Sequence, residues 1–289
     1  MKAGFLIGLL ATIFLTISAE LTDSEYQNAI PGHIEYDPEF KKLYPHIPAP
    51  ASAAEPFIVG GSESRPNTRP YQCAMYIPVP GGTSFCGCSL ITARTVLTAA
   101  HCVDNTVNNI TIWFGIHNLP PNQQAHGVSV STRDIILHPG WTRSILLHDI
   151  ALIILPQTLQ LTNNISTVML PLDNSQDYLG NTTLVSGWGR PSDSIGTISP
   201  VLREVTSFVI SNFPCRLAYM GIVEESHICC SGRYGRSTCN GDSGGPLVIN
   251  GVQVGVVSFG SNWGCEQGWP PVFARVANYL PWIHQNWLT

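Results

Sequence analysis

Ten short segments rich in Val, Ile, Thr and aromatic residues follow one another along the chain, each bounded by Gly, Pro, Asn or Asp. This pattern is typical of β-strands joined by tight turns. The composition agrees, because 26 glycines and 22 prolines among 289 residues favour turns over long helices. A helical pattern occurs only near 276–288, where Pro281 interrupts it. We therefore predict an all-β sandwich or barrel. The expected strands are 71–77, 95–99, 110–114, 128–131, 150–155, 183–186, 205–210, 246–249, 252–259 and 272–276.

The first 19 residues have the pattern of a secretory signal peptide. Lys2 precedes an apolar run at 3–17, and Ser18 and Ala19 supply small residues for a cleavage site. The run is too short to span a bilayer, which disfavours the alternative of a buried or anchoring helix. We predict cleavage after Ala19, secretion to the extracellular space and no association with a membrane.

A second segment, 20–57, separates this signal from the rest of the chain. It contains two lysines, seven acidic residues and six prolines, and it lacks cysteine. Such a composition buries little apolar surface, so we expect either a loosely ordered linker or a removable activation pro-segment. Residues 58–289 have a net charge of only −1 and contain no lysine. Without a basic patch, nucleic acid is not an expected partner.

All nine cysteines lie after residue 57. In a secreted protein they predict a disulfide framework. Zinc is disfavoured, because neither Cys86-x-Cys88 nor Cys229-Cys230 has the C-x₂₋₄-C spacing of structural zinc sites. An odd number leaves at least one thiol free or bridged to another chain. Three sequons predict glycosylation sites, at Asn109, Asn164 and Asn181.

Three short motifs supply the residue types that nucleophilic catalysis requires. They are Thr98-Ala-Ala-His101-Cys102, His148-Asp149-Ile-Ala-Leu152 and Asn240-Gly-Asp-Ser243-Gly-Gly-Pro246. Serine is a poor nucleophile until a neighbouring base accepts its proton, and a buried carboxylate holds that base in one tautomer. Each motif alone is compatible with a structural role. Together they offer a base, an orienting carboxylate and a nucleophile, with glycines that let the backbone aim N–H groups at an oxyanion.

With these motifs, the chain resembles the trypsin/chymotrypsin family of serine endopeptidases from residue 58 to the C-terminus. The resemblance also includes Ile58-Val-Gly-Gly61, Ser186-Gly-Trp-Gly189 and Ser258-Phe-Gly260. It implies two antiparallel six-stranded β-barrels packed together, with a short C-terminal helix. It divides the chain into a signal peptide (1–19), an activation pro-segment (20–57) and a serine protease domain (58–289).

The resemblance implies a role for each residue of the catalytic site. His101 acts as general base and then as general acid, Asp149 orients it, and Ser243 attacks the scissile carbonyl. The backbone N–H groups of Gly241 and Ser243 form the oxyanion hole. The alternative from another class is a catalytically silent homologue that acts as a binding protein. The loss of one of the three triad residues would indicate such a homologue.

Activation is also implied by the resemblance. Asp242 receives the new amino terminus of Ile58 once the pro-segment is cut, so the uncut chain is expected to be almost inactive. Phe57 stands before this bond, where most relatives have Arg or Lys. A trypsin is therefore not expected to cut it, whereas an enzyme that cleaves after large apolar residues could, including this one.

The primary specificity pocket departs from that of trypsins. Ser237 stands six residues before Ser243, where trypsins have Asp, so cleavage after Arg or Lys is not expected. Gly260 leaves one wall open, whereas Pro271 occupies a position where glycine is common and could narrow the slot. The backbone from Ser258 to Gly260 is expected to pair with the substrate as an added strand. We predict cleavage after large aromatic residues or Leu, with elastase-like or collagen-cleaving specificity as the alternative.

The resemblance pairs six cysteines, as Cys86–Cys102, Cys215–Cys229 and Cys239–Cys265. Cys73 and Cys88 lie symmetrically about Pro80-Gly81, the expected tip of a hairpin. We predict that they face each other as a candidate fourth disulfide, with Cys230 free.

No cofactor or metal is expected. Calcium needs carboxylate-rich oxygen ligands, and 105–133 contains no acidic residue. We expect a monomer that acts on protein or peptide substrates and that protease inhibitors can bind.

Overall fold

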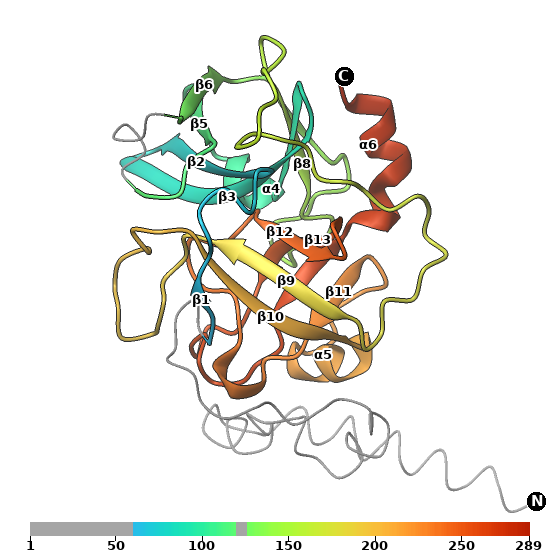
Figure 1. Cartoon of the computed structure of the whole chain (residues 1–289). Helices are drawn as coiled ribbons and strands as arrows, with labels where there is room; N and C mark the ends of the chain where they lie inside the picture. Colours follow the sequence, from blue (N-terminus) through green and yellow to red (C-terminus); the bar gives the residue numbers. More distant parts are fainter. Residues whose placement is uncertain (1–59, 120–125) are drawn as a thin grey trace, which may run out of the picture.

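Two antiparallel sheets lie one above the other in the view of Figure 1, and the boundary between them is called the seam below. The structure is a computed structural model that describes residues 60–119 and 126–289. The predicted signal peptide, the pro-segment, Phe57 and Ile58 lie outside these residues. The all-β fold with two barrel-like sheets is confirmed.

The first sheet contains seven short strands. They are β2 (Gln72–Val79), β3 (Gly82–Thr92), β4 (Thr95–Thr98), β5 (Ile110–Phe114), β6 (Val128–Thr132), β7 (Ile135–Leu137) and β8 (Ala151–Ile154). Their order is β6-β5-β2-β3-β4-β8-β7, an open half-barrel instead of the expected six-stranded barrel. The two edge strands, β6 and β7, follow each other in the chain and are separated by a bend at 133–134. The buried Thr132 hydroxyl donates to Ile154 O (3.0 Å) and accepts the N–H of Asp134 (3.1 Å), which ends one strand and starts the next.

The second sheet closes into a six-stranded barrel, as expected. Its strands are β9 (Thr182–Gly187), β10 (Arg203–Ile210), β11 (His227–Cys230), β12 (Pro246–Ile249), β13 (Val252–Phe259) and β14 (Val272–Arg275). The order β10-β11-β14-β13-β12-β9 closes because β9 pairs with β10, and β1 (Ser62–Glu63) adds along β10. The β12–β13 hairpin turns at Asn250-Gly251, where both residues have positive φ (49° and 83°). A two-residue hairpin turn requires this geometry.

The helices are short, and two of them were not predicted. They are α4 (Ala100–Val103), α5 (Asn212–Ala218) and α6 (Leu280–Asn286), with the 3₁₀ helices η3 (Arg233–Gly235) and η4 (Val276–Tyr279). The sequence indicated a helix only at the C-terminus. α4 and α5 are too short for an apolar period, and α5 is held by the Cys215–Cys229 disulfide. Pro281 does not interrupt α6 but occupies its first turn. N–H groups there make no hydrogen bond within the helix, so proline costs none.

None of the helices in the described ranges is long and apolar enough to cross a membrane. α6 instead closes over the first sheet. The Thr95 hydroxyl donates to Leu288 O and accepts the Leu288 N–H, both at 2.8 Å. The end of the chain is thereby tied to β4.

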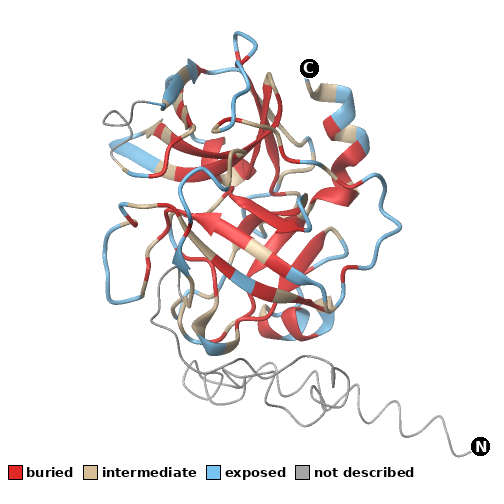
Figure 2. Ribbon diagram, viewed as in Figure 1, coloured by how far each residue is buried: buried red, intermediate tan, exposed pale blue. Residues whose placement is uncertain are grey.

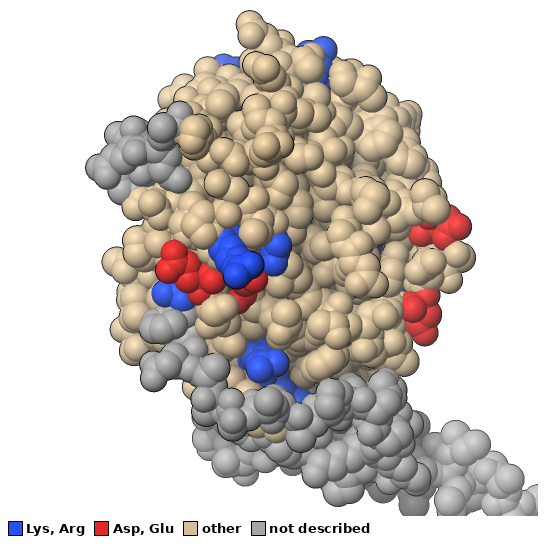
Figure 3. Space-filling view, viewed as in Figure 1, with Lys and Arg blue, Asp and Glu red and all other residues tan. Residues whose placement is uncertain are grey.

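One apolar cluster fills the first sheet and reaches into the second, whose interior also has a cluster of its own around Val185, Leu247 and Phe273. Leu97, Ile112 and Leu152 of the first sheet belong to the same buried cluster as Val256 of β13 and Ile283 of α6. Figure 2 shows buried residues along the inner strands and exposed residues on the loops. Charged side chains are few on the face drawn in Figure 3, as expected for a chain with 11% charged residues.

Buried polar side chains cross the seam between the sheets. The Ser89 hydroxyl donates to Gln253 Oε1, and the Ser186 hydroxyl donates to Gln72 Oε1, each at 2.7 Å. A buried hydrogen bond is directional, so it fixes the relative position of two elements more sharply than apolar contact does. The site described next lies along this seam.

Candidate active site

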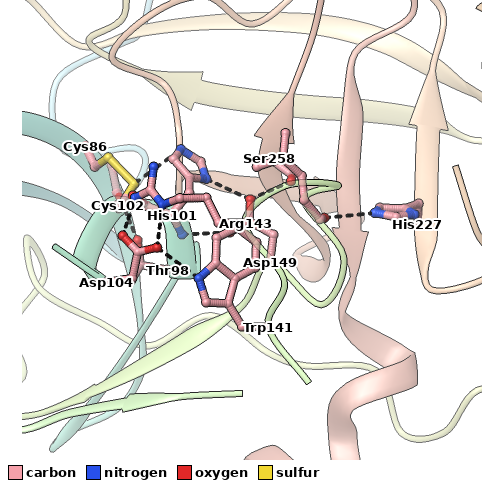
Figure 4. A network of polar contacts seen from close by, with 12 residues as sticks. Cys86, Thr98, His101, Cys102, Asp104, Trp141, Arg143, Asp149, His227 and Ser258 are labelled. Carbon is pink, nitrogen blue, oxygen red and sulfur yellow. Dashed lines mark hydrogen bonds and ion pairs between the residues drawn. A yellow bond between two sulfur atoms is a disulfide. The ribbon is translucent and has the colours of Figure 1, made fainter. Parts of the chain in front are cut away.

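His101 and Asp149 are brought together by the pairing of β4 with β8. Thr98 pairs with Ala151 in this ladder, so the residues just beyond the pair lie side by side. His101 Nδ1 is 2.7 Å from Asp149 Oδ2, and the backbone N–H of His101 donates to Asp149 Oδ1 at 2.8 Å (Figure 4). The imidazole and the carboxylate are therefore fixed to each other at two points.

Asp149 is fully buried and has a third donor. The Ser258 hydroxyl, near the end of β13, donates to Asp149 Oδ2 at 2.6 Å. A buried carboxylate is costly unless hydrogen bonds replace its hydration, and three donors do so here. An ionised carboxylate can only accept, so His101 Nδ1 carries the proton and Nε2 is left as an acceptor. The sequence indicated Ser258 only as a substrate-binding residue.

Ser243 lies half-buried at the seam. Its carbonyl accepts the N–H of Gly87 on β3 at 2.8 Å. The next residue, Gly244, has φ of 77° and packs against Thr98, where a Cβ atom would collide with the hydroxyl. The turn thus needs glycine, and it brings Ser243 beside the end of β4, from which α4 and His101 follow. In the described part of the chain no hydrogen bond joins Ser243 Oγ to His101, and such bonds are often long without substrate.

The backbone around Gly241 is held in a tight turn. Gly241 has φ of 101°, which side chains rarely adopt. The Asp242 N–H donates to Cys239 O and the Gly245 N–H donates to Asp242 O, both at 2.9 Å. The second bond holds the carbonyl of the Asp242–Ser243 peptide, whose N–H is one expected oxyanion donor. The carbonyl of the Asn240–Gly241 peptide, which carries the other expected donor, accepts the Arg190 N–H at 2.9 Å.

The Asp242 side chain is fully buried beneath this turn. Oδ1 accepts the N–H of Gly189 at 2.8 Å, and Oδ2 accepts the N–H of Cys239 at 2.9 Å. Burial raises the pKa of Asp242 to about 6, against the lowering effect of these two hydrogen bonds. Among residues 60–119 and 126–289, no cationic side chain forms an ion pair with this carboxylate.

The expected pocket residues lie on separate segments around the second barrel. Ser237 is buried, and its hydroxyl donates to Thr238 O at 3.1 Å. Gly260 follows β13 at the surface, and a Cβ atom there would meet nothing within 4 Å. Pro271 is buried just before β14, and its carbonyl accepts the Cys230 N–H at 3.1 Å.

Four disulfides form. Their Cα–Cα distances are 4.9 Å for Cys73–Cys88, 6.3 Å for Cys86–Cys102, 6.7 Å for Cys215–Cys229 and 5.5 Å for Cys239–Cys265. Cys73 and Cys88 face each other across the β2–β3 hairpin, which turns at Pro80-Gly81. Cys230 is a buried free thiol, and burial raises its pKa to about 12. A thiol with so little thiolate is unreactive at neutral pH.

Two groups of described residues have the spacing of metal ligands. They are Cys86 with His101 and Cys102, and Asp193 with Cys239 and Cys265. Both groups contain the two partners of a disulfide. A disulfide offers no thiolate, so neither group fits a metal ion.

Sequence reasoning missed a network beside His101. Arg143 donates from Nε to Asp104 Oδ2 (2.8 Å), from Nη2 to Asp104 Oδ1, and from Nη2 to His101 O (3.2 Å). Trp141 Nε1 also donates to Asp104 Oδ2, at 3.0 Å (Figure 4). Burial tends to raise the pKa of Asp104, but the bonds from Arg143 and Trp141 hold it below its usual value. The network ties the segment that leads to Asp149 onto α4, and no periodic pattern links residues so far apart.

A second missed contact joins two loops near the pocket. Asp193 accepts the N–H of Cys265 (2.7 Å) and of Glu266 (3.1 Å), and its own N–H donates to Glu266 Oε2 (2.9 Å). These bonds hold the loop after Gly189 to the loop that follows Gly260. They act together with the Cys239–Cys265 disulfide, which anchors the same loop beside the turn of Ser243.

Known proteins share this sequence and architecture. The Trypsin family model matches residues 58–283. Brachyurin from Leptuca pugilator is 42% identical over 226 residues, which cover 78% of this chain and 96% of brachyurin. A chymotrypsin from Phaedon cochleariae is 40% identical over 235 residues, which cover 80% and 83% of the two chains. The solved structure of HL collagenase has a TM-score of 0.72 at 35% identity, and the match covers 78% of this chain and 96% of the collagenase chain.

The family match includes the motifs of His101, Asp149 and Ser243 and both sheets. The relatives are named as chymotrypsins, trypsins and brachyurin, all of which are serine endopeptidases. The chain therefore belongs to the trypsin family of serine proteases and is a serine endopeptidase.

Proposed function

We propose that the mature chain hydrolyses peptide bonds with His101, Asp149 and Ser243 as its catalytic triad. The observation that carries this proposal is the buried Asp149 carboxylate, which accepts hydrogen bonds from the ring and backbone of His101 and from Ser258. Such a carboxylate keeps the imidazole in the tautomer whose Nε2 accepts a proton.

Catalysis then proceeds through an acyl-enzyme. His101 Nε2 takes the proton of Ser243 Oγ as this oxygen attacks the scissile carbonyl carbon, and His101 then gives the proton to the leaving amine. The N–H groups of Gly241 and Ser243 stabilise the negative oxygen of the tetrahedral intermediate, and each such donor is worth about 10²–10³ in kcat. Water, deprotonated by His101, releases the acyl group and restores Ser243.

The test of this proposal is the loss of the nucleophile. Ser243→Ala in correctly processed protein is expected to lower kcat by about 10⁴ to 10⁶, because the residual rate comes only from binding and oxyanion stabilisation. Ser129→Ala, on the exposed face of β6, is the matched control. Ester hydrolysis by the Ser243→Ala variant at the wild-type rate would refute the triad. Wild-type protein that binds peptides without cleaving them would instead indicate a silent binding homologue.

We propose that cleavage follows large apolar residues. Support comes from Ser237, a neutral residue where trypsins have Asp, and from the open space beside Gly260. Digestion of a mixed peptide library tests this specificity. Cuts after Phe, Tyr or Leu would support it, whereas cuts after Ala or Val would indicate that Pro271 narrows the pocket.

Collagen cleavage is a second candidate function. It is favoured by the likeness to HL collagenase, which extends over 96% of that chain. Incubation with triple-helical collagen, with heat-denatured collagen as the control substrate, separates the two functions. Cleavage of the denatured form alone would leave only the chymotrypsin-like activity.

We further propose that the enzyme is a secreted monomer made as a zymogen. Four disulfides suit an oxidising compartment. The sequon residues Asn109 and Asn181 are exposed and Asn164 is half-buried, which leaves acceptors for glycans. Asp242 is a buried carboxylate without an ion-pair partner in the described ranges, which suits a role as acceptor of the Ile58 amino terminus after cleavage.

A further inference from the structure

His227 is a buried histidine that the proposed mechanism does not use. It begins β11 and is 1% exposed. Nδ1 accepts the backbone N–H of Glu224 at 2.9 Å, so the ring proton is on Nε2. Nε2 lies 3.5 Å from the carbonyl oxygen of Leu146, to which it donates. In Figure 4, His227 lies on the opposite side of Asp149 from His101.

The backbone that His227 supports is strained. Leu146 has φ of 52° and His148 has φ of 54°, in the left-handed region that residues other than glycine seldom adopt. Both residues lie within three positions of Asp149. A strained segment persists only when its surroundings hold it, and such segments gather at functional sites. The bond from His227 to the Leu146 carbonyl is one such support, and the Tyr279 hydroxyl at 3.3 Å from His148 Nδ1 is another.

The same imidazole also packs on the substrate strand. Its ring meets the Phe259 ring edge-on, with centroids 5.7 Å apart and planes at 81°. Tyr219 packs edge-on against the same Phe259 ring, at 5.3 Å and 87°. Phe259 stands between Ser258, which bonds Asp149, and Gly260. Both Leu146 and Phe259 remain partly exposed, so each presents a surface to a chain bound along this strand.

We propose that His227 is a positioning residue that sets the binding groove for substrate residues N-terminal to the scissile bond. It does so by holding the left-handed Leu146 turn and the Phe259 ring in fixed relation. This inference rests on the proposed endopeptidase mechanism, but His227 touches none of the reacting atoms. Its loss should therefore weaken the binding of extended peptides and leave the chemistry on short substrates unchanged.

Protonation of His227 would remove this support, because a protonated Nδ1 cannot accept the Glu224 N–H. Burial lowers the pKa of His227 below its usual value, against the opposing effects of Asp149 and Glu224. The neutral ring is thus the form present at neutral pH. The remaining charged groups on this side line the adjoining cavity and are Asp177, Arg216, Glu225 and Arg275.

Two substitutions separate the hydrogen bonds from the bulk of the ring. His227→Gln keeps one acceptor for Glu224 and one donor for Leu146, whereas His227→Met fills the space with neither. The substrates are an aromatic single-residue ester and a tetrapeptide amide that ends in the same aromatic residue. His227→Met is expected to lower kcat/KM for the tetrapeptide about fivefold or more, mainly through KM, as the loss of one or two hydrogen bonds predicts. Ester hydrolysis should stay within about twofold, and His227→Gln should resemble the wild type on both substrates.

The pH profile gives a second readout. In the wild type, the tetrapeptide-to-ester ratio of kcat/KM should fall at acid pH, where a histidine whose pKa is lowered becomes charged. The ratio for His227→Gln should stay flat. His284→Met, an exposed histidine of α6, is the matched control and should behave as the wild type.

Three outcomes would overturn the role of His227. They are equal losses on both substrates, a Gln variant that behaves like the Met variant, and a wild-type ratio that does not change with pH. If the wild type fails to hydrolyse the ester, the proposed triad is wrong, and the positioning role is then tested without activity. In that case, NMR of the Ser243→Ala protein should show the His227 proton on Nε2, and a proton on Nδ1 at neutral pH would contradict the inference.

Discussion

At the scale of single residues, the candidate site contains two buried carboxylates, Asp149 and Asp242, which accept hydrogen bonds from different kinds of donor. The Asp149 carboxylate accepts hydrogen bonds from the His101 ring, the Ser258 hydroxyl and the backbone N–H of His101. Asp242 accepts from two backbone N–H groups and pairs with no cation of the described segments. Burial makes both groups sensitive to the loss or gain of one partner. A change at either carboxylate should therefore have a measurable effect, on turnover for Asp149 and on the pH dependence of stability for Asp242.

Replacing Asp149 by Asn should nearly abolish turnover while preserving the fold. An amide in this position no longer selects the tautomer of His101 whose Nε2 accepts, so kcat should fall by about 10⁴. Steady-state ester hydrolysis measures the effect, with thermal unfolding as a check of the fold. Asp134→Asn, an exposed acid of the same sheet, is the control. A variant at Asp149 with wild-type kcat would exclude this residue from the mechanism.

The buried Asp242 carboxylate predicts that the uncut and cleaved proteins respond differently to pH. Its folded pKa of about 6 is above its ordinary value of 3.8. The folded uncut chain therefore binds more protons than the unfolded chain between these values, and its free energy of unfolding falls as the pH rises from about 4 to 6. A shift of this size corresponds to roughly 3 kcal/mol. The amino terminus of Ile58 should offset this loss after cleavage.

Thermal unfolding of the Ser243→Ala protein, before and after cleavage at Phe57 by an added chymotrypsin, measures this difference. The cleaved form should gain stability relative to the uncut form as the pH rises from 4 to 7. Uncut Asp242→Asn should lack the fall seen in the uncut parent. Identical pH profiles for the cut and uncut proteins would rule out the ion pair.

At the scale of elements, the β2–β3 hairpin holds Ser243, the proposed nucleophile. β3 donates the Gly87 N–H to the Ser243 carbonyl, and it also carries Cys86, whose disulfide to Cys102 ties β3 to α4. The Cys73–Cys88 disulfide joins the two strands of this hairpin in register. The hairpin is thus cross-linked within itself and to the element that bears His101.

Removing the Cys73–Cys88 bridge should weaken the protein without disabling it. The bridge spans a sequence separation of 15 residues, and a loop of this length corresponds to about 2–4 kcal/mol of stability in the chain-entropy description. Cys73→Ala combined with Cys88→Gly should lower the free energy of unfolding in urea by this amount, with kcat changed less than about twofold. Cys230→Ala, at the buried free thiol, provides a comparison at a cysteine that closes no loop. An unchanged urea midpoint for the double variant would contradict the prediction.

At the scale of the whole molecule, the site exists only where the two sheets meet. His101 and Asp149 lie on segments that adjoin β4 and β8 of the first sheet, whereas Ser243 precedes β12 and Ser258 lies in β13 of the second. The bonds that cross the seam, such as Ser89 to Gln253, hold these halves in one arrangement. Cleavage before Ile58 would add a further bond within the second barrel, at Asp242. The identity of Phe57 should therefore decide which protease activates the whole enzyme.

The proposed zymogen should activate itself. Phe57 precedes the expected cleavage site and fits the specificity proposed above. Purified wild-type zymogen should convert with a rate that rises with its concentration, whereas Ser243→Ala should remain uncut. Phe57→Arg should lose this self-conversion and become a substrate of trypsin. N-terminal sequencing of the products follows the reaction, and equal conversion of wild type and Ser243→Ala would show that self-cleavage does not occur.

Local properties of the sequence were enough to predict ten of the strands and the two hairpin turns, whereas β1, β3, β7 and β11 were missing from the expected strands. The alternation of apolar and polar residues, the β-branched residues and the turn residues each form patterns only a few positions long. Such patterns can be recognised without knowledge of distant contacts. The turn at Asn250-Gly251 is an example, because only its two residues determine the required φ angles. The family motifs likewise name His101, Asp149 and Ser243 without any geometry.

Only the tertiary structure decided which residues support that site. The split of the outer strand at Thr132, the short helix α5, the Asp104–Arg143 pair and the contact of His227 with Leu146 were not predicted. Each depends on partners that lie far apart along the chain or on an element too short for a periodic pattern. Such contacts form because packing brings polar groups together and excludes water, so that these groups must form hydrogen bonds with each other. This requirement arises only after the chain has folded.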